Sequence, residues 1–252
     1  MLIFDFDGVL MDSINEVAVT AHNAITGDLV VSPDELSPDL VALFKLNRFH
    51  VQPIGDAILL MDWCIDNYHN RPHQLLTRTE YQDIIRDGYS FLIDRTERFF
   101  ATRKRFMQKD RVRWLSLHAP FQPIWHELIK CTGHKVIMLT NKDQEATLEL
   151  CHHFGLPISG QNIYSGDNGA TKVENLIKIR ERFSCDSYSF VDDSLKNLRE
   201  LDRHFNIHRK VLKLIFASWG YCGPNDKSMA KACGYEVFDQ EDLIDLIRRM
   251  ET

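Results

Sequence analysis

Short apolar runs alternate with amphipathic stretches over most of this chain. The runs lie at 2–4, 136–139, 188–191 and 214–217, and the amphipathic stretches lie at 143–154, 171–183, 194–204 and 239–250. The runs show no alternation of polar and apolar residues, which is typical of strands buried on both faces of a parallel sheet. Strands that alternate with helices in this way predict an α/β fold with right-handed crossovers. The expected architecture is a doubly wound parallel sheet.

Some ends of the expected helices are marked by specific residues. Thr171 and Glu174 have the T-x-x-E spacing of a capping box at a helix start. Gly155 stands where a helix C′ residue is expected, and Asp239 can cap the final helix. These residues place the boundaries of three of the predicted helices.

Residues 14–114 have a different pattern. The segment contains few strand-like runs, and between 80 and 106 its apolar residues recur near helical spacing. It is expected to form an all-helical cap inserted into an α/β core that comprises 1–13 and 115–252. Within it, the run RTERFFATRKRFMQKDRVR at 95–113 is rich in Lys and Arg. We interpret this run as the solvent-facing side of a long helix, in preference to a surface for nucleic acid.

The composition of the chain argues against two classes of binding partner. The chain has 30 Lys and Arg against 36 Asp and Glu, which gives a net charge of −6, so neither nucleic acid nor a membrane surface is expected as a partner. Two aspartates within the first seven residues argue against a signal peptide. The six cysteines form no C-x-x-C pair and suit free thiols in a reducing compartment. The expected location is the cytoplasm, as a monomer or a homodimer.

Polar residues follow the predicted strands. Asp5 and Asp7 follow the first strand, Thr140 and Asn141 the second, Asp192 and Asp193 the third, and Ser218 and Trp219 the fourth. The carboxyl ends of parallel strands meet at one edge of the sheet, where ligands bind in folds of this class. Lys172, at the start of a predicted helix, is expected at the same edge. The sequence therefore predicts a site with several carboxylates, a hydroxyl, an amide and an ammonium group.

Carboxylates gathered in this way need a counter-charge. Two carboxylates about 4 Å apart repel by about 4 kcal/mol at an effective dielectric constant of 20, so one becomes protonated or a cation lies between them. A site rich in oxygen and poor in histidine suits Mg²⁺, while Thr140, Lys172 and the amides after residue 139 suit a phosphate. A carboxylate beside both groups can attack phosphorus to give an aspartyl-phosphate. A second aspartate two residues on can protonate the leaving oxygen and later activate water.

The same segments resemble the signatures of a known superfamily. The residues DFDGVLMDS at 5–13 resemble the first signature of the haloacid-dehalogenase-like (HAD) hydrolases, and VIMLTN at 136–141, Lys172 and VDDS at 191–194 resemble the other three. SWGY at 218–221 is similar to a stretch of the phosphoglycolate-phosphatase-like branch. The helical insert resembles that superfamily's C1 cap in position and helical texture. The resemblance implies a Rossmann-like core that carries a helical cap.

The resemblance also implies a role for each matching residue. Asp5 would be the nucleophile and a Mg²⁺ ligand, and Asp7 the general acid and base, which binds the metal through its backbone carbonyl. Asp193 would be the acidic metal ligand, with Asp192 behind it. Thr140, the backbone amide of Asn141 and Lys172 would hold the phosphate, and Lys172 would also neutralise Asp5. The fourth signature often begins Gly-Asp and has a further Asp four residues later, where this chain has Asp192 and Asn197.

Other interpretations of these residues remain open. Taken without the resemblance, one of Asp192 and Asp193 caps the helix that follows, and Lys172 is a surface lysine at a helix start. The preferred function is a Mg²⁺-dependent phosphatase that acts on a small phosphorylated metabolite through an aspartyl-phosphate. A phosphomutase would use the same aspartates, and a non-catalytic regulator could keep the same fold. A dehalogenase is less favoured, because that branch generally lacks the second aspartate, here Asp7.

Overall fold

The chain divides into two compact units. The computed structural model describes residues 1–88, 92–130, 136–208 and 210–249. One unit, the core unit, comprises Met1–Asp12 and Ala119–Thr252, and the other, the helical unit, comprises Ser13–His118. In the core unit, strand β2 (Met11–Asp12) pairs antiparallel with β3 (Ala119–Pro120), with Asp12 opposite Ala119. This short pair joins the two points at which the chain leaves and re-enters the core unit.

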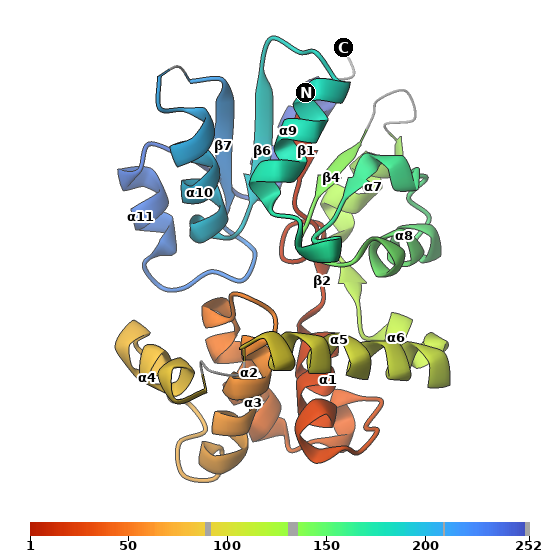
Figure 1. The fold of residues 1–252 in the computed structure, drawn as a ribbon, viewed down its shortest axis with the longest axis vertical. Coiled ribbons are helices and arrows are strands. Elements are labelled where there is room, and N and C mark those ends of the chain that lie inside the picture. Colours follow the sequence, from red (N-terminus) through yellow and green to blue (C-terminus); the bar gives the residue numbers. More distant parts are fainter. Residues whose placement is uncertain (89–91, 131–135, 209, 250–252) are drawn as a thin grey trace. The chain divides into compact units, whose positions relative to one another are not determined.

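The core unit is built on a six-stranded parallel sheet in the order β5-β4-β1-β6-β7-β8 (Figure 1). Its strands are β1 (Leu2–Phe4), β4 (Ile137–Leu139), β5 (Ile163–Tyr164), β6 (Tyr188–Asp192), β7 (Leu212–Ala217) and β8 (Glu236–Phe238). The sheet confirms the predicted α/β architecture and the four apolar runs as strands. The sequence pattern missed the edge strands β5 and β8, because β5 has two residues and β8 begins with the exposed Glu236, so neither forms an apolar run like those of β1 and β4.

Helices cover both faces of this sheet. They are α7 (Gln122–Lys130), α8 (Gln144–His153), α9 (Lys172–Arg182), α10 (Leu195–Phe205), α11 (Asp226–Ala232) and α12 (Gln240–Arg249). Ile137 and Leu139 of β4 share a buried cluster with Leu176 of α9 and Leu198 of α10, which lie over the sheet in Figure 1. Met138 points to the other face of the sheet and contacts Cys151 of α8. The sequence did not predict α7 or α11.

The expected helix boundaries are present in the core unit. Thr171 and Glu174 form the reciprocal capping box of α9, and Gly155 follows α8 with a φ of 77°, a left-handed conformation that favours glycine. Asp239 accepts a hydrogen bond from the backbone N–H of Asp242 at the start of α12. The helix that follows β6 differs, because its N-cap is Ser194, whose hydroxyl accepts from the N–H of Asn197. Neither Asp192 nor Asp193 is therefore the cap of α10.

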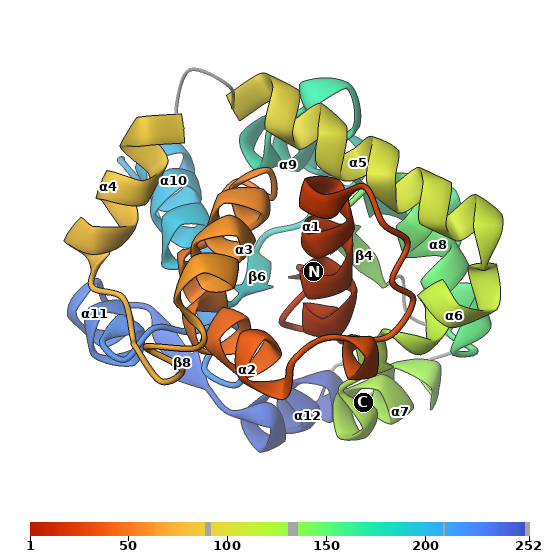
Figure 2. The same ribbon diagram turned by 90° about the horizontal axis from the view of Figure 1, so that it is seen from below.

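The helical unit contains helices and no strand among the residues that the structure describes. It comprises α1 (Ile14–Thr26), α2 (Pro38–Asn47), α3 (Asp56–Asn67), α4 (Arg78–Gly88), α5 (Leu92–Lys109) and α6 (Arg111–Ser116), with 3₁₀ turns η1 (Pro33–Glu35) and η2 (Arg48–His50). Helices α1, α3 and α5 pack on one another (Figure 2). Their apolar faces form a core that includes Phe44, Met61 and Phe99.

The basic run on α5 is not wholly solvent-facing, which corrects the interpretation from the sequence. Arg95 and Arg103 are buried together with Phe99 and Phe106 of the same helix. Arg103 donates through Nε and Nη2 to the two carboxylate oxygens of Glu16 on α1, each at 2.8 Å. The intervening Arg98 is exposed. The helix therefore carries arginines on both its solvent face and its buried face.

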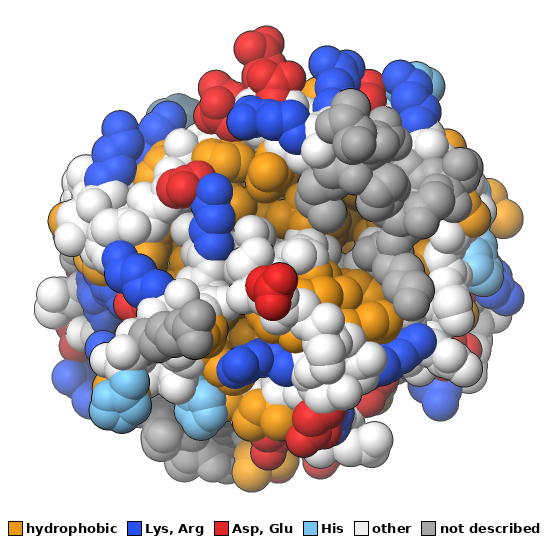
Figure 3. All heavy atoms as spheres, turned by 90° about the horizontal axis from the view of Figure 1, so that it is seen from above, with side chains coloured by type: hydrophobic (Ala, Val, Ile, Leu, Met, Phe, Trp, Pro, Cys, Tyr) orange, Lys and Arg blue, Asp and Glu red, His pale blue; other side chains and the backbone are white. Residues whose placement is uncertain are grey.

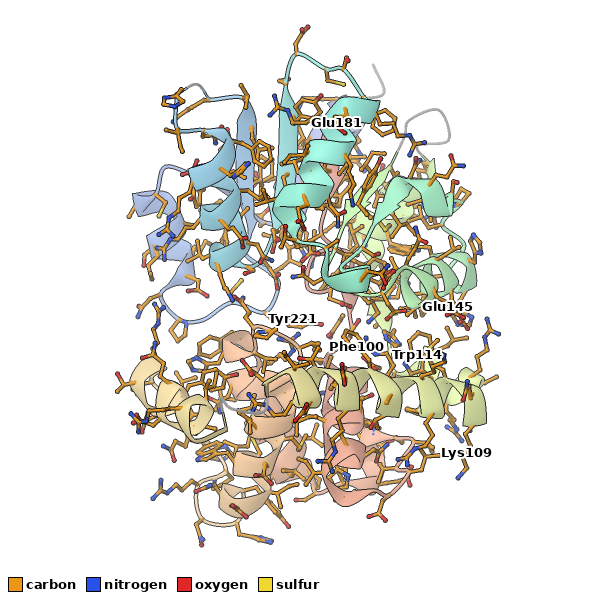
Figure 4. The ribbon with its side chains drawn as sticks, in the orientation of Figure 1. Phe100, Lys109, Trp114, Glu145, Glu181 and Tyr221 are labelled. Atoms are coloured by element: carbon orange, nitrogen blue, oxygen red, sulfur yellow. The ribbon has the colours of Figure 1, made fainter. Side chains whose placement is uncertain are left out.

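The amino ends of the strands lie at the end of the core unit shown in Figure 3, where hydrophobic side chains are exposed between charged ones. A shallow pocket lies between the end of α9, marked by Glu181 in Figure 4, and the start of β6. Its lining includes Arg180, Cys185 and Tyr188. Ligands bind at the other end of parallel sheets, so the carboxyl ends of the strands are the place to look for the site.

The state of the cysteines and the character of the helices bear on two further expectations. The five described cysteines, Cys64, Cys151, Cys185, Cys222 and Cys233, are free thiols, and Cys131 lies outside the described residues. Within the described ranges, we find no helix with the length and apolar character of a membrane span.

The buried Arg103–Glu16 pair gives a stability prediction. We expect Arg103→Met to destabilise the protein by about 3–5 kcal/mol, because Glu16, which is 0 % exposed, would keep a buried charge without its partner. Urea unfolding measures the loss. The exposed Arg98→Met, which removes the same charge from the same helix, should change stability by about 0.5 kcal/mol or less. Equal effects of the two substitutions would contradict this account.

Candidate active site

Three neighbouring strands bring the acidic residues together. β1 lies between β4 and β6, and Phe4 pairs with Met138 on one side and Val191 on the other. The residues just beyond these pairs therefore lie at one level of the sheet. Each of Asp5, Asp192 and Asp193 offers a carboxylate oxygen within 4.8 Å of one from the others. All three side chains are buried, so this edge of the sheet has a concentrated negative charge.

Lys172 is the counter-charge within this cluster. Its Nζ lies 2.6 Å from Oδ2 of Asp192 and 3.0 Å from Oδ1 of Asp5. The residue is the first of α9, held by the capping box, and its side chain is only 4 % exposed. Lys172 is therefore a buried residue between two carboxylates, and the alternative of a surface lysine is wrong.

Asp192 and Asp193 have different surroundings. Asp192 accepts from the backbone N–H of Ser194 at 2.7 Å through Oδ1, and from Nδ2 of Asn197 at 2.9 Å and Lys172 through Oδ2. Asp193 accepts from the backbone N–H of Tyr221 at 2.6 Å through Oδ2. Both oxygens of Asp192 are thus used to hold β6, Lys172 and the start of α10 together, which leaves Asp193 as the better candidate to face a metal.

Two glycines make room for Asp193. A Cβ atom on Gly8 would lie 2.1 Å from Oδ2 of Asp193, and one on Gly220 would lie 2.4 Å from its Cβ. Gly8 also has a φ of 83°. The loop after β7 is further tied to the loop after β1, since Trp219 donates from Nε1 to the carbonyl oxygen of Val9 at 3.1 Å. These contacts explain why a tryptophan and a glycine stand next to each other in SWGY.

Tyr221 connects the two sides of this loop pair (Figure 4). Its backbone N–H bonds to Asp193, and its hydroxyl lies 3.0 Å from Oδ1 of Asp12. One residue therefore links the carboxylate after β6 to the end of the segment that carries Asp5 and Asp7.

Asp7 lies beside the cluster and not within the group of three carboxylates. Its Oδ1 is 3.3 Å from Nζ of Lys142, whose side chain is 1 % exposed. Lys142 follows Thr140 and Asn141 after β4, and its backbone N–H donates to Oγ1 of Thr140 at 3.1 Å. Thr140 is buried and Asn141 is exposed. The residues predicted to hold a phosphate thus come from β4 and α9, on elements next to Asp5.

Comparisons with known proteins bear on the fold. No protein-family model matches the chain, and no curated protein sequence matches it significantly. Among solved structures, similar ones are protein tyrosine kinase A of Mycobacterium tuberculosis (14 % identity, 98 % of this chain and 96 % of that chain, TM-score 0.58) and a candidate phosphatase of Clostridium difficile (13 %, 98 % and 97 %, 0.52). A third is a haloacid-dehalogenase-like protein of Agrobacterium tumefaciens (13 %, 99 % and 96 %, 0.52).

The chain has the fold of the HAD-like hydrolases. The similarity extends over nearly the full length of both chains in each comparison. At these identities it concerns the fold alone, so the roles of the HAD-like signature residues depend on their own geometry.

Burial and neighbouring charges shift the pKa values of two groups in this site. Burial raises the pKa of Asp5 to about 7; the positive charge of Lys172 opposes this rise and the negative charge of Asp192 adds to it. Burial alone would lower the pKa of Lys172, but Asp192 and Asp5 outweigh it, so its pKa is raised. The lysine is therefore charged, and it contacts two of the three carboxylates. An added cation would let Asp5 ionise at neutral pH.

Sequence reasoning missed two residues of this site. Lys142 follows the Thr140–Asn141 pair directly, but a lone lysine after a strand carries no recognisable signal. Tyr221 entered the sequence analysis only as the last residue of SWGY at 218–221, and no contact was predicted for it. Their contacts with Asp7 and Asp193 depend on loops that are far apart in sequence.

The packing of Gly220 gives a direct test of the loop arrangement. We expect Gly220→Ala to destabilise the protein by about 1–3 kcal/mol in urea unfolding, because the new Cβ would overlap Asp193 and the carbonyl oxygen of Gly8. Gly160→Ala is the matched control, since a Cβ there would lie 3.7 Å from Leu148, an ordinary contact. If both variants unfold alike, Asp193 is not confined between these glycines.

The raised pKa of Asp5 gives a pH prediction for the metal-free protein. The folded state holds the proton of Asp5 more tightly than the unfolded state, whose pKa is near 3.8. Folding stability contributed by this group therefore falls as pH rises from about 4 to about 7. In EDTA, urea unfolding of wild type should show this fall, and Asp5→Asn should show a smaller one. A wild-type slope equal to that of Asp5→Asn would contradict the prediction.

Proposed function

We propose that this chain is a Mg²⁺-dependent phosphatase that hydrolyses a small phosphorylated metabolite through an aspartyl-phosphate intermediate. The observation that carries the proposal is the position of Asp5, at the end of the central strand, with Lys172 at 3.0 Å and the carboxylates of Asp192 and Asp193 within 4.8 Å. The second aspartate, Asp7, lies two residues on. The HAD-like fold supports this assignment because it places such a site at the edge of the sheet where ligands bind.

The donor set fits a hard divalent cation. Carboxylate oxygens from Asp5 and Asp193 are the ligands that Mg²⁺ prefers, and no histidine or thiol of the described residues belongs to the cluster. The backbone carbonyl of Asp7 is assigned as a further ligand. When bound, the ion would neutralise charge on the carboxylates and on the phosphate. Asp192 supports Asp193 and Lys172 from behind.

The chain's own residues account for the chemistry. A carboxylate oxygen of Asp5 attacks phosphorus and forms a P–O bond while the bond to the leaving alcohol breaks. Asp7 gives its proton to that oxygen, and afterwards removes a proton from the water that hydrolyses the acyl phosphate. Thr140, the backbone amide of Asn141 and Lys172 hold the phosphate oxygens. Lys142, which lies 3.3 Å from Asp7, orients this carboxylate.

Two other functions use the same residues. A phosphomutase would form the aspartyl-phosphate and return the phosphoryl group to another oxygen of the substrate, and a non-catalytic regulator would keep the fold without turnover. One structure that shares the fold is described as a protein tyrosine kinase. The position of Asp7, two residues from Asp5, favours a catalytic role over a non-catalytic one. Free phosphate, isomerised product and phosphorylated acceptor distinguish these outcomes. The cytoplasm is the proposed location.

The assay is phosphate release from p-nitrophenyl phosphate with Mg²⁺ and with EDTA. We expect wild type to be active only with the divalent cation. Asp5→Asn should lower turnover on the order of 10³-fold or more, because loss of the nucleophile removes the covalent path. Glu145→Gln removes an exposed carboxylate from the first turn of α8 (Figure 4) and should keep wild-type activity. Full activity of Asp5→Asn would exclude Asp5 as the nucleophile.

A further inference from the structure

The helical unit contains a second cluster of buried charged groups. It comprises Arg48 of η2, Asp56 at the start of α3, Tyr81 of α4 and Arg95 of α5. All four residues are buried, with Tyr81 4 % and Arg95 6 % exposed. None of these residues belongs to the core unit or to the HAD-like signatures.

Several buried hydrogen-bond donors of Arg95 and Tyr81 have no acceptor among the described residues. Arg95 makes one long contact, from Nη2 to Oδ1 of Asp56 at 3.4 Å. Its Nε and Nη1 and the hydroxyl of Tyr81 are buried, and no hydrogen-bond partner reaches them within the described part of the chain. Buried polar groups are normally paired, so each exception calls for an explanation.

Arg103, on the same helix as Arg95, is a buried arginine with which Arg95 can be compared. It binds both carboxylate oxygens of Glu16 at 2.8 Å, in the forked geometry that suits a guanidinium. Arg95, eight residues earlier, is buried to a similar degree but has no such fork. Among the residues that the structure describes, Arg95 therefore has no partner that accepts from two of its nitrogens.

The charges around Tyr81 favour an anion as that partner. Asp56, Arg48 and Arg95 all act on its hydroxyl, and burial together with Asp56 raises the pKa of Tyr81. The hydroxyl therefore stays protonated and can donate. The charged groups that act on this hydroxyl are two guanidinium groups and one carboxylate. A water molecule could accept hydrogen bonds here, but an anion would also be attracted by the guanidinium groups.

The tyrosine is held in place by its neighbours. The ring of His50 stacks on the ring of Tyr81, with centroids 4.6 Å apart and 16° between the planes. Nε2 of His50 is in turn 2.9 Å from the carbonyl oxygen of Leu76. Arg48 donates from Nη1 to the carbonyl oxygen of Val51 at 3.2 Å. These contacts fix the groups before any ligand arrives.

We propose that Arg95 and Tyr81, with Arg48 beside them, form a binding site in the helical unit for an oxyanion group, a phosphate or a carboxylate. Its residues differ from those assigned to the phosphate in the core unit, Thr140 and Lys172, and the proposal does not depend on the phosphatase activity. Arg95 would donate to the group from a nitrogen that Asp56 does not use, and Tyr81 would donate its hydroxyl proton to one of the group's oxygens. A ligand of this protein would then carry an anionic group that the helical unit recognises.

The test is calorimetric titration of the full chain, without Mg²⁺, with inorganic phosphate and separately with acetate at constant ionic strength. All samples carry Thr140→Val, which weakens phosphate binding in the core unit. We expect at least one of the two anions to bind. Arg95→Met should weaken this binding about tenfold or more, and Tyr81→Phe, which removes only the hydroxyl, about threefold. Arg98→Met removes an exposed charge of the same helix and should leave the affinity unchanged.

The outcomes separate clearly. Binding of phosphate, of acetate or of both, weakened in Arg95→Met and in Tyr81→Phe, supports the site and shows which groups it accepts. If the parent protein binds neither anion, or if Tyr81→Phe and Arg98→Met bind alike, the proposal is wrong and a buried water meets these donors. Should Arg95→Met fail to fold, Tyr81→Phe decides, since it keeps the buried ion pair. If the protein binds the anion but releases no phosphate from any ester, the anion site is supported and the proposed phosphatase function is wrong.

Discussion

The position of Lys172 between Asp5 and Asp192 is the interaction on which the site depends. A single ammonium group, 4 % exposed, is shared by carboxylates from two adjacent strands. It fixes the relative position of β1, β6 and the start of α9, and the cluster that it joins also contains the carboxylate of Asp193. The arrangement that stabilises the fold at this edge thus also gathers the oxygen ligands that the proposed divalent cation would need.

The sequence alone was sufficient to predict those site residues whose positions follow from strand geometry. Asp5, Thr140 and Asp192 could be placed at one edge because each directly follows an apolar run, and parallel strands end at the same side of a sheet. It was insufficient where a role depends on contacts between loops. Nothing in the order of residues indicates that Tyr221 bonds to both Asp193 and Asp12, or that Lys142 reaches Asp7. The edge strands were missed because β5 has only two residues and β8 begins with an exposed glutamate, so neither forms an apolar run.

The choice between Asp192 and Asp193 shows how adjacent residues acquire different functions. Neighbouring residues of a strand point to opposite faces, so Asp192 turns toward α9 and meets Lys172 and Asn197, while Asp193 turns toward the loops that contain Gly8 and Gly220. Asn197 stands where the related signature often has another aspartate, and its amide donates to Asp192. Compared with an aspartate, an amide at this position removes one possible metal ligand and provides a neutral hydrogen-bond donor that holds Asp192 in place.

The basic run on α5 shows why charge counts from sequence are a weak guide to surfaces. Arg95, Phe99, Arg103 and Phe106 share the buried face of one helix at spacings of three or four residues. A buried guanidinium is stable only where its donors are met, and Glu16 meets those of Arg103. For Arg95 the described residues supply one distant oxygen of Asp56. Two residues with the same side chain, helix and burial therefore differ in their hydrogen-bond partners, and this difference is the basis for proposing that Arg95 binds a ligand.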